Sequence, residues 1–476
     1  MKKFFNMNNL GISLFGGLFL GGCCQLGIIH TVILMLALFL LIPGILKAID
    51  QEKESYRRFQ DAGMYLSQME SSFKNNRTIF DCLRETRDLF RDGEMKDCLK
   101  NAVNTLEKGN AGTEAYRKAF GMIEEHYGCE QMRLTHDFFL KNTENGGSRT
   151  LPVEVLEKRR IAWSRETEKC RSKKRSLLNA VLGCILSFFA VSEILVRVPE
   201  IISEDIDMKI ITLGSERTAT LILAVLLVFI VRHVYRKNAE DWLSEEQEMS
   251  EETLTKAFKY LEEFDPRKEM IKSIKWAVIP LVSTLIFAVK LKSIIVLSVG
   301  IPITILFLNQ YKMEYRLVKK NLRKEVERDY PRWLLTIILL LDRESVIGAI
   351  YKSMNTAPNV LKYPLACMQK TLEKKPNDPE AFFSFLEILE MPQVTESMKM
   401  LYSISAGTGG NPEKQLLQIV DKNTAMTLRS EEIKNSNRVA GIMWYTLLPS
   451  LPVGIKMMFD MFLMTSVLYS SYDKMI

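Results

Sequence analysis

The sequence lacks the short motifs that mark most enzyme active sites. It contains no Gly-Lys-Ser or Gly-Lys-Thr of a phosphate-binding loop, no His-Glu-x-x-His, no Cys-x-x-Cys and no Gly-x-Ser-x-Gly. No Gly-x-Gly-Asp occurs in an apolar stretch, which argues against an intramembrane aspartyl peptidase. Of only four histidines, His30 and His233 lie in or beside apolar stretches, and surface or capping roles are favoured over catalysis for His126 and His136. We therefore expect a protein that is not an enzyme, with no catalytic or metal-binding residues and no cofactor.

Cysteine pairs with metal-ligand spacing are also lacking. In a cytoplasm we expect the cysteines to be reduced and to act as small apolar residues. Leu20-Gly21-Gly22-Cys23 resembles a lipoprotein processing site, but an apolar stretch, Leu26–Leu46, comes directly after it, where a lipoprotein turns polar. A Gly-rich first span that folds back as a hairpin near Gln25 is the favoured alternative. The eight cysteines are Cys23, Cys24, Cys82, Cys98, Cys129, Cys170, Cys184 and Cys367.

Long apolar runs, in contrast, are abundant. The hydrophobic fraction of 47% is ordinary, but these residues are concentrated in a few blocks. A helix needs about 20 apolar residues to cross a bilayer, and a soluble protein would have to bury too many such stretches, since most of its helices are amphipathic. The sequence therefore predicts a polytopic membrane protein. The blocks are Gly11–Leu46, Leu177–Val198, Ala219–Val231, Ala277–Val289, Ile294–Leu308 and Val439–Tyr469.

The charges beside these blocks predict their orientation. Lysine and arginine near the ends of spans favour the cytoplasmic side. Basic residues precede the block at Leu177, follow the block ending at Val231 and fill Tyr311–Lys324, whereas the loop 199–216 is acidic. We therefore expect that loop to face outward and both charged segments between the spans to lie in the cytoplasm.

The chain also repeats itself. Leu106-Glu107-Lys108 is matched by Leu372-Glu373-Lys374, and each is followed by an aromatic-rich helix, Ala115–Phe120 in one copy and Ala381–Phe385 in the other. Glu144-Asn145-Gly146-Gly147 then corresponds to Ala406-Gly407-Thr408-Gly409-Gly410. The matching residues are about 265 residues apart, which is far longer than the repeat of a solenoid protein. This spacing predicts a duplicated domain.

These observations define an all-α architecture with two helical bundles and about eight transmembrane helices. The terminal block contains internal prolines and is either a hairpin or one broken span with an interfacial helix, so the side occupied by Ile476 stays open. The expected segments are an N-terminal transmembrane hairpin 1–47, a first bundle 48–176, a hairpin 177–237, a connector helix 238–273, a hairpin 274–309, a second bundle 310–437 and a C-terminal membrane block 438–476.

Helical periodicity predicts about six antiparallel helices in each bundle. In the first bundle we expect helices at Gln60–Met69, Ile79–Leu89, Met95–Leu106, Thr113–Tyr127, Gln131–Leu140 and Val153–Arg171. In the second bundle we expect helices near Leu334–Leu341, Val346–Ala357, Pro364–Leu372, Glu380–Glu390, Thr395–Ser405 and Pro412–Ile433.

Charged residues inside apolar blocks are candidates for function, because burying them in a bilayer is costly. Glu193 and Arg197 are four residues apart and able to pair, and Lys456 and Asp460 have the same spacing. The simpler interpretation of both pairs is interfacial snorkelling. The Gly-Gly turns are best explained as tight helix-to-helix turns, with ligand binding as the alternative.

Three motifs of the second bundle resemble a known family. They are Asp329-Tyr330-Pro331-Arg332-Trp333-Leu334-Leu335, Ser345–Ile350 and Ile404–Pro412, with its Gly-Gly turn. They resemble the F domain of type II secretion and type IV filament platform proteins, and Phe59–Ala62 with Thr78–Leu83 resembles it more weakly. The span arrangement is similar to the tight-adherence (Tad/Flp) pilus platform, with a TadB-like half fused to a TadC-like half.

The resemblance implies a platform in the bacterial inner membrane. Its implied partners are a secretion or pilus assembly ATPase, a pilin or pseudopilin, membrane lipids and further copies of the chain, and no nucleic acid. The basic faces at Arg57-Arg58 and Lys319–Lys324 suit anionic lipid or acidic motor surfaces. A multi-pass transporter, or a membrane scaffold or sensor, remains the alternative. The candidate interaction residues on the bundles are Gly146, Gly147, Tyr330, Arg332, Gly407, Gly409 and Gly410.

Overall fold

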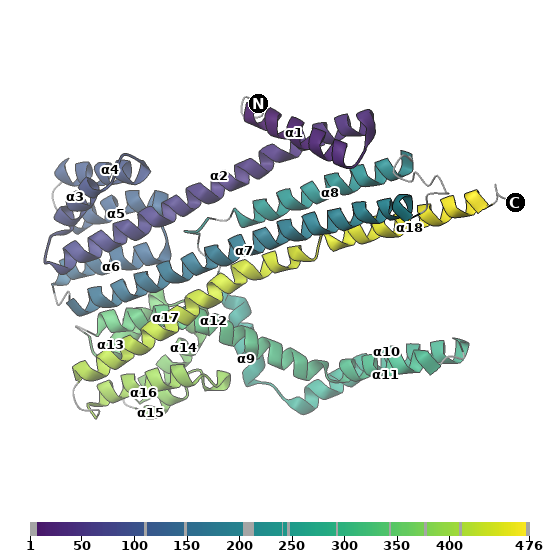
Figure 1. The fold of residues 1–476 in the computed structure, drawn as a ribbon. Coiled ribbons are helices and arrows are strands. Elements are labelled where there is room, and N and C mark those ends of the chain that lie inside the picture. The colour runs from purple at the N-terminus through teal and green to yellow at the C-terminus, as the bar shows by residue number, and fades with distance from the viewer. Residues whose placement is uncertain are drawn as a thin grey trace.

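The computed structural model describes ten segments of the chain, and within them the structure is helical without any β-strand (Figure 1). The expected all-α class is confirmed for these residues. Gly147, Gly409, Gly410 and Ile476 lie outside them. The described residues are 7–108, 112–146, 150–202, 214–239, 241–244, 248–291, 294–341, 344–375, 378–408 and 412–472.

The first half of the chain begins with a helical hairpin and continues into a bundle. The hairpin turns at Gln25, which has a φ of 51°, and Gly27, which has a φ of 77°. Thr78 caps α3 by accepting a hydrogen bond from the backbone N–H of Asp81 at 3.1 Å. The helices are α1 (Met7–Cys23), α2 (Gly27–Lys74), α3 (Ile79–Leu89), α4 (Glu94–Lys108), α5 (Thr113–Tyr127), α6 (Glu130–Asn145), α7 (Thr150–Ile202) and α8 (Gly214–Asn238).

The connector between the two halves contains a shorter helix than the sequence predicts. Within the predicted connector helix 238–273, the helix begins only at Glu251, where Ser250 supplies the N-cap, and it ends at Glu262. Before it, Trp242 and Leu243 are buried in the bundle core instead of continuing a helix. The hydroxyl of Ser55 on α2 accepts a hydrogen bond from the backbone N–H of Trp242 at 2.8 Å, which fixes this segment to the first bundle. The connector helix is α9 (Glu251–Glu262).

The second half repeats the order of the first, a hairpin followed by a bundle. The expected helix Glu380–Glu390 is wrong beyond Phe383, because Leu386 and Glu390 adopt left-handed backbone conformations that end it. The elements are α10 (Pro266–Leu291), α11 (Ile294–Leu308), α12 (Gln310–Leu340), α13 (Val346–Ser353), η2 (Met354–Thr356), α14 (Asn359–Lys374), α15 (Pro379–Phe383), η3 (Glu387–Leu389), α16 (Pro392–Ala406), α17 (Pro412–Met443), η4 (Trp444–Thr446) and α18 (Ser450–Tyr472).

The two bundles correspond helix by helix. Helices α3 to α7 begin at Ile79, Glu94, Thr113, Glu130 and Thr150, and α13 to α17 begin at Val346, Asn359, Pro379, Pro392 and Pro412. The starts of equivalent helices are about 265 residues apart, the same offset as that between the repeated sequence motifs. Core side chains match at the same spacing, since each of these pairs is buried: Tyr65 and Tyr330, Leu106 and Leu372, Phe120 and Phe385. The order of helices therefore repeats between the bundles at the same offset as the sequence motifs.

The last helix of each bundle pairs with the other. Lys158 on α7 lies 3.4 Å from the carboxylate of Asp421 on α17, and the Sγ of Cys170 lies 3.7 Å from the carbonyl oxygen of Asn435. Both contacts join positions that correspond in the repeat, so α7 and α17 run parallel and in register. The buried apolar residues of both bundles form one continuous cluster. The two bundles are therefore joined along equivalent helices.

Helices α2 and α7 are unusually long, with 48 and 53 residues. Each runs without a break from the bundle into an apolar stretch, although the sequence suggests a boundary near residue 176. Two ion pairs tie them together, Glu70 to Arg160 at 2.8 Å and Glu52 to Arg171 at 2.9 Å. The first bundle is therefore connected to the apolar region by two continuous helices.

Five helices of the described chain are long and apolar enough to cross a membrane, fewer than the eight expected. The shortfall has two causes. Helices α1 and α11 have only 17 and 15 residues, below the usual spanning length, although each packs as a hairpin with its neighbour. The terminal block does not fold back, because α18 continues outward from α17 past a break at η4 (Figure 1). The apolar ends of these helices lie on one side of the molecule and the bundles on the other.

The turn after α16 yields a test of its backbone conformation. Gly407 has a φ of 65°, where an added methyl group would meet open space but the backbone would be strained. Gly407→Ala should therefore destabilise the protein by about 1 kcal/mol. In the control Gly121→Ala, on the exposed side of α5, the substitution should stabilise the helix by about 0.5–1 kcal/mol. Melting temperatures of the detergent-purified variants measure both effects, and equal shifts in one direction would contradict the assignment.

Candidate functional site

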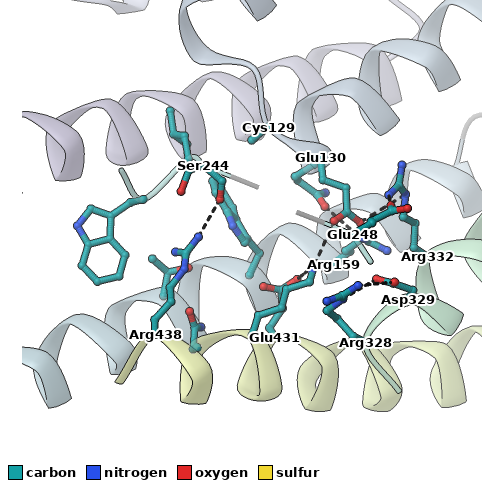
Figure 2. A pocket seen from close by; sticks show the side chains of 17 residues that line it. Cys129, Glu130, Arg159, Ser244, Glu248, Arg328, Asp329, Arg332, Glu431 and Arg438 are labelled. Atoms are coloured by element: carbon teal, nitrogen blue, oxygen red, sulfur yellow. Dashed lines mark hydrogen bonds and ion pairs between the residues drawn. The ribbon is translucent and has the colours of Figure 1, made fainter. Parts of the chain in front are cut away.

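The two bundles meet at a seam of charged side chains (Figure 2). Helix α6 begins there, so Glu130 stands in its first turn, where the helix dipole favours a carboxylate. Arg159 comes from α7, Arg332 from α12 and Lys434 from α17. The seam therefore draws on both halves of the duplicated chain.

Glu130 is the centre of this seam. Its carboxylate contacts Arg159, lies 3.1 Å from the Nζ of Lys434 and 3.9 Å from the Nε of Arg332. Burial alone would raise the pKa of Glu130, but the charges of these three cations outweigh it and hold the pKa well below its usual range. One acidic side chain of the first half thus neutralises a cation of its own half and two of the second.

The connector completes the network. Glu248 lies 3.2 Å from Arg332, and the guanidinium of Arg438 donates a hydrogen bond to the carbonyl oxygen of Ser244 at 2.8 Å. Glu431 lies 3.3 Å from Lys434. Burial alone would lower the pKa of Lys434, but the carboxylates of Glu130 and Glu431 outweigh it and raise that pKa. The segment between the two halves is therefore fixed to the same seam.

The motif that carries the family resemblance divides between the seam and the core. Arg328 makes two hydrogen bonds to the carboxylate of Asp329, at 2.9 and 2.8 Å, and both are buried beside α17. Arg332 reaches Glu130 and Glu248 in the seam. Tyr330 is fully buried and packs against Trp333, whose indole N–H donates a hydrogen bond to Ser353 at 2.9 Å. Tyr330 is therefore a core residue and not part of the seam.

A cavity of about 290 Å³ lies within the seam. Three buried donors on its walls have no hydrogen-bond partner: Nη1 of Arg159, Nε1 of Trp242 and Nδ2 of Asn435. Among the described residues, no group of histidine, cysteine and acidic side chains is arranged to hold a metal ion. The ion pairs between the halves are the dominant feature of the seam and connect the two bundles.

The glycine turns lie elsewhere. Gly146 ends α6 with a φ of 71°, and Gly407 ends α16 with a φ of 65°. At Gly407 the backbone N–H of Thr408 donates a hydrogen bond to the carbonyl of Ser403 at 3.2 Å, which closes the helix end. Both glycines are exposed, and because α7 and α17 start just after them, they sit at the bundle ends remote from the apolar helices.

A second charged cluster lies among the apolar helices. Lys456 on α18 is 2.9 Å from Asp460, 2.9 Å from Glu216 on α8 and 3.7 Å from Glu193 on α7. Lys456 and Asp460 are only 4% and 2% exposed, so the pair is buried instead of reaching toward an interface. The side chain of Arg197 lies outside the described part of the chain, and Glu193 is directed toward Lys456. This cluster ties the terminal helix to α7 and α8.

The basic faces identified in the sequence are partly used inside the molecule. Arg58 lies 3.3 Å from Asp241 of the connector, and Lys319 lies 2.9 Å from Glu390. Arg57 and Lys320 are exposed. The surface that lipid or a partner can reach is therefore smaller than the sequence suggests.

Sequence reasoning missed Glu130, Arg159, Lys434 and Glu216. The first three are ordinary charged residues of amphipathic helices, and nothing in their spacing shows that they meet. Glu216 had a weak signal, since it is an acidic residue at the border of an apolar block.

Comparison with known proteins adds no relative. No protein-family model, no curated protein and no solved structure matches the chain. Its function has to be inferred from the residues and from the geometry of the seam, the bundles and the apolar helices.

The seam yields a stability prediction. Glu130→Ala leaves Arg159, Lys434 and Arg332 without their shared carboxylate, and should cost about 3 kcal/mol of stability. Because the pKa of Glu130 is lowered on folding, its contribution is complete above the unfolded pKa of about 4.3 and is lost as the pH falls below it. The loss should therefore be smaller at low pH.

Thermal unfolding of the purified variants at two pH values measures this effect. The matched control is Glu252→Ala, which removes only an exposed pair with Lys256 and should leave melting unchanged. If Glu130→Ala and the wild type had the same melting temperature, the ion pairs of the seam would contribute nothing to stability.

The cluster around Lys456 yields another prediction. Lys456→Met leaves three carboxylates without their cation and should lower the melting temperature strongly, since breaking a buried ion pair costs about 3–5 kcal/mol. Adding Glu216→Gln and Asp460→Asn removes the surplus charge and should restore much of the loss. Fluorescence-detected gel filtration after heating measures both variants. A neutral effect of Lys456→Met would mean that water already screens this cluster.

Proposed function

We propose that this protein is an inner-membrane platform of a Tad-type or type IV filament machine, or of a related type II secretion machine. In this role it couples a cytoplasmic assembly ATPase to the insertion of a pilin or pseudopilin into a filament. The two bundles lie in the cytoplasm and the apolar helices lie in the bacterial plasma membrane. This role requires no catalysis by the chain itself and no cofactor.

One observation carries the proposal. Helices α7 and α17 pair in register between the bundles and both lead toward the apolar helices on the same side. Because a helix is stiff along its axis, a push on either bundle moves the apolar ends together. A machine that converts ATPase strokes into movement of a subunit within a bilayer needs such a connection.

The remaining geometry supports the same role. The turns at Gly146 and Gly407 are exposed at the ends of the bundles farthest from the apolar helices, where a soluble motor has access. Exposed Lys312 and Lys320 lie on α12 near its start beside the α10–α11 hairpin, a position suited to anionic lipid headgroups. The terminal Tyr472 lies on the side opposite the bundles and would therefore face outward.

Affinity purification from membranes tests the proposal. When the full chain is cross-linked and purified from a strain that assembles surface filaments, a P-loop secretion ATPase should be recovered with it. Deletion of the gene for this chain should abolish the filaments. Glu130→Ala, which loosens the seam, should reduce filament yield at least tenfold at equal expression, whereas Glu252→Ala should not.

Reporter fusions supply an independent check of orientation. Fusions at residues near 110 and 380 should be active only as cytoplasmic reporters. Repeated absence of the ATPase from the recovered complexes, or outward reporters at both positions, would overturn the proposal.

A further inference from the structure

The cavity within the seam is a feature that the ion pairs alone do not explain. Its volume of about 290 Å³ is far larger than the roughly 10–15 Å³ that one water molecule needs. Its walls come from α6, α7, α12, α17 and the segment that follows α8, so both halves of the chain enclose it (Figure 2). A ligand bound here would contact both halves at once.

The charges on the walls of this cavity do not balance. Each of the four carboxylates that line it has a cation of the same cavity within ion-pair distance. The pairs are Glu130 with Arg159, Glu248 with Arg332 at 3.2 Å, Asp329 with Arg328 at 2.8 Å and Glu431 with Lys434 at 3.3 Å. Arg438 is the fifth cation of the walls, and within the described residues it contacts the carbonyl oxygen of Ser244 and no carboxylate. The four pairs therefore leave one positive charge uncompensated.

The walls also carry buried donors without an acceptor. Arg159 donates to Gln131 at 3.0 Å and to Glu130, but its Nη1 has no partner in the part of the chain that the structure describes. The same is true of the indole Nε1 of Trp242. Arg159 and Trp242 are only 7% and 4% exposed, and buried N–H groups are almost always hydrogen-bonded because an unpaired one is costly. The cavity therefore lacks an acceptor that carries negative charge.

We propose that this cavity binds a phosphate group, which accepts hydrogen bonds from Nη1 of Arg159 and Nε1 of Trp242 and neutralises Arg438. A phosphate offers several acceptor oxygens together with negative charge, and the planar fork of a guanidinium matches it. The amide of Asn435, which also lines the cavity without a partner, can turn to donate to the same group. This site does not depend on the proposed role in filament assembly.

The position of the cavity gives the phosphate two sources. Arg438 directly precedes Val439, where the terminal apolar block begins, and Trp242 follows the apolar helix α8, which ends at Asn238. The cavity therefore lies where the bundles meet the apolar helices, within reach of a phospholipid headgroup and of inorganic phosphate from solution. Either source places the same group between the two halves and should stabilise the folded chain that binds it.

Titration calorimetry of the delipidated full chain in detergent tests the soluble source. The probe is inorganic phosphate, and the reference is chloride at equal ionic strength. Phosphate should fill one saturable site per chain that chloride does not occupy. Arg438→Gln should weaken this binding about tenfold. Trp242→Phe, which removes the N–H and keeps an aromatic ring, should weaken it about threefold.

The matched control is Arg429→Gln. Arg429 lies on α17 like Arg438, but it pairs with Glu327 at 3.3 Å outside the cavity, so its loss should leave phosphate binding unchanged. Gel filtration shows which variants remain folded, and Trp242→Phe provides the result if Arg438→Gln does not.

Native mass spectrometry tests the lipid source. The full chain is exchanged into phosphatidylglycerol and then stripped with detergent. One lipid should stay bound per chain, and Arg438→Gln should retain at least tenfold less than Arg429→Gln. Retained lipid without calorimetric binding assigns the site to a headgroup, and calorimetric binding without retained lipid assigns it to soluble phosphate.

Two results would overturn the proposal. If neither arm showed a bound phosphate group, the cavity would hold water only. If Arg438→Gln and Trp242→Phe bound phosphate and lipid as tightly as Arg429→Gln, the phosphate group would bind elsewhere. Neither measurement uses filament yield or recovery of the ATPase, so failure of the proposed function would leave this result unchanged.

Discussion

The carboxylate of Glu130 joins the two halves of the molecule, because it is shared by Arg159 of the first half and by Arg332 and Lys434 of the second. A cation in a partly dry seam needs a counter-charge, and removing one partner leaves the others uncompensated. The connector contributes through Glu248, so the segment between the halves is held at the same point. The parallel pairing of α7 and α17 lies directly beside this network, so the geometry of the whole molecule depends on it.

The chain contains two units with the same order of helices, but their surroundings differ. In the first unit the hairpin is sealed by α8, whereas its counterpart α10–α11 stands apart. The cluster at Lys456 adds to this asymmetry, because it ties α18 of the second unit to α7 and α8 of the first. Within the described residues, α1, α2, α7, α8 and α18 are thus packed together, whereas α10 and α11 pack mainly against each other.

Much of the fold could be read from the sequence. Helices α3 and α5 begin and end at the predicted residues, and the repeated Leu-Glu-Lys motifs fall in the corresponding helices α4 and α14. These predictions succeed because periodic apolar residues and turn residues act locally. The predicted helix through Glu390 fails because Leu386 adopts a left-handed conformation that no local signal announces. Similarly, the sequence of the terminal block leaves a hairpin and a single broken span as alternatives. In the structure, Lys456 pairs with Glu216 on α8 and the block continues outward as α18 after the break at η4.

The helical class, the duplication and the position of the apolar blocks could all be inferred from the chain alone, because each depends on the period and the composition of neighbouring residues. The seam could not, since Glu130 and Lys434 are 304 residues apart and each looks like a solvated charge on an amphipathic helix. Packing of the two bundles against each other is what brings them within hydrogen-bonding distance. The same holds for Lys456 and Glu216, which are 240 residues apart and meet only because α18 packs against α8.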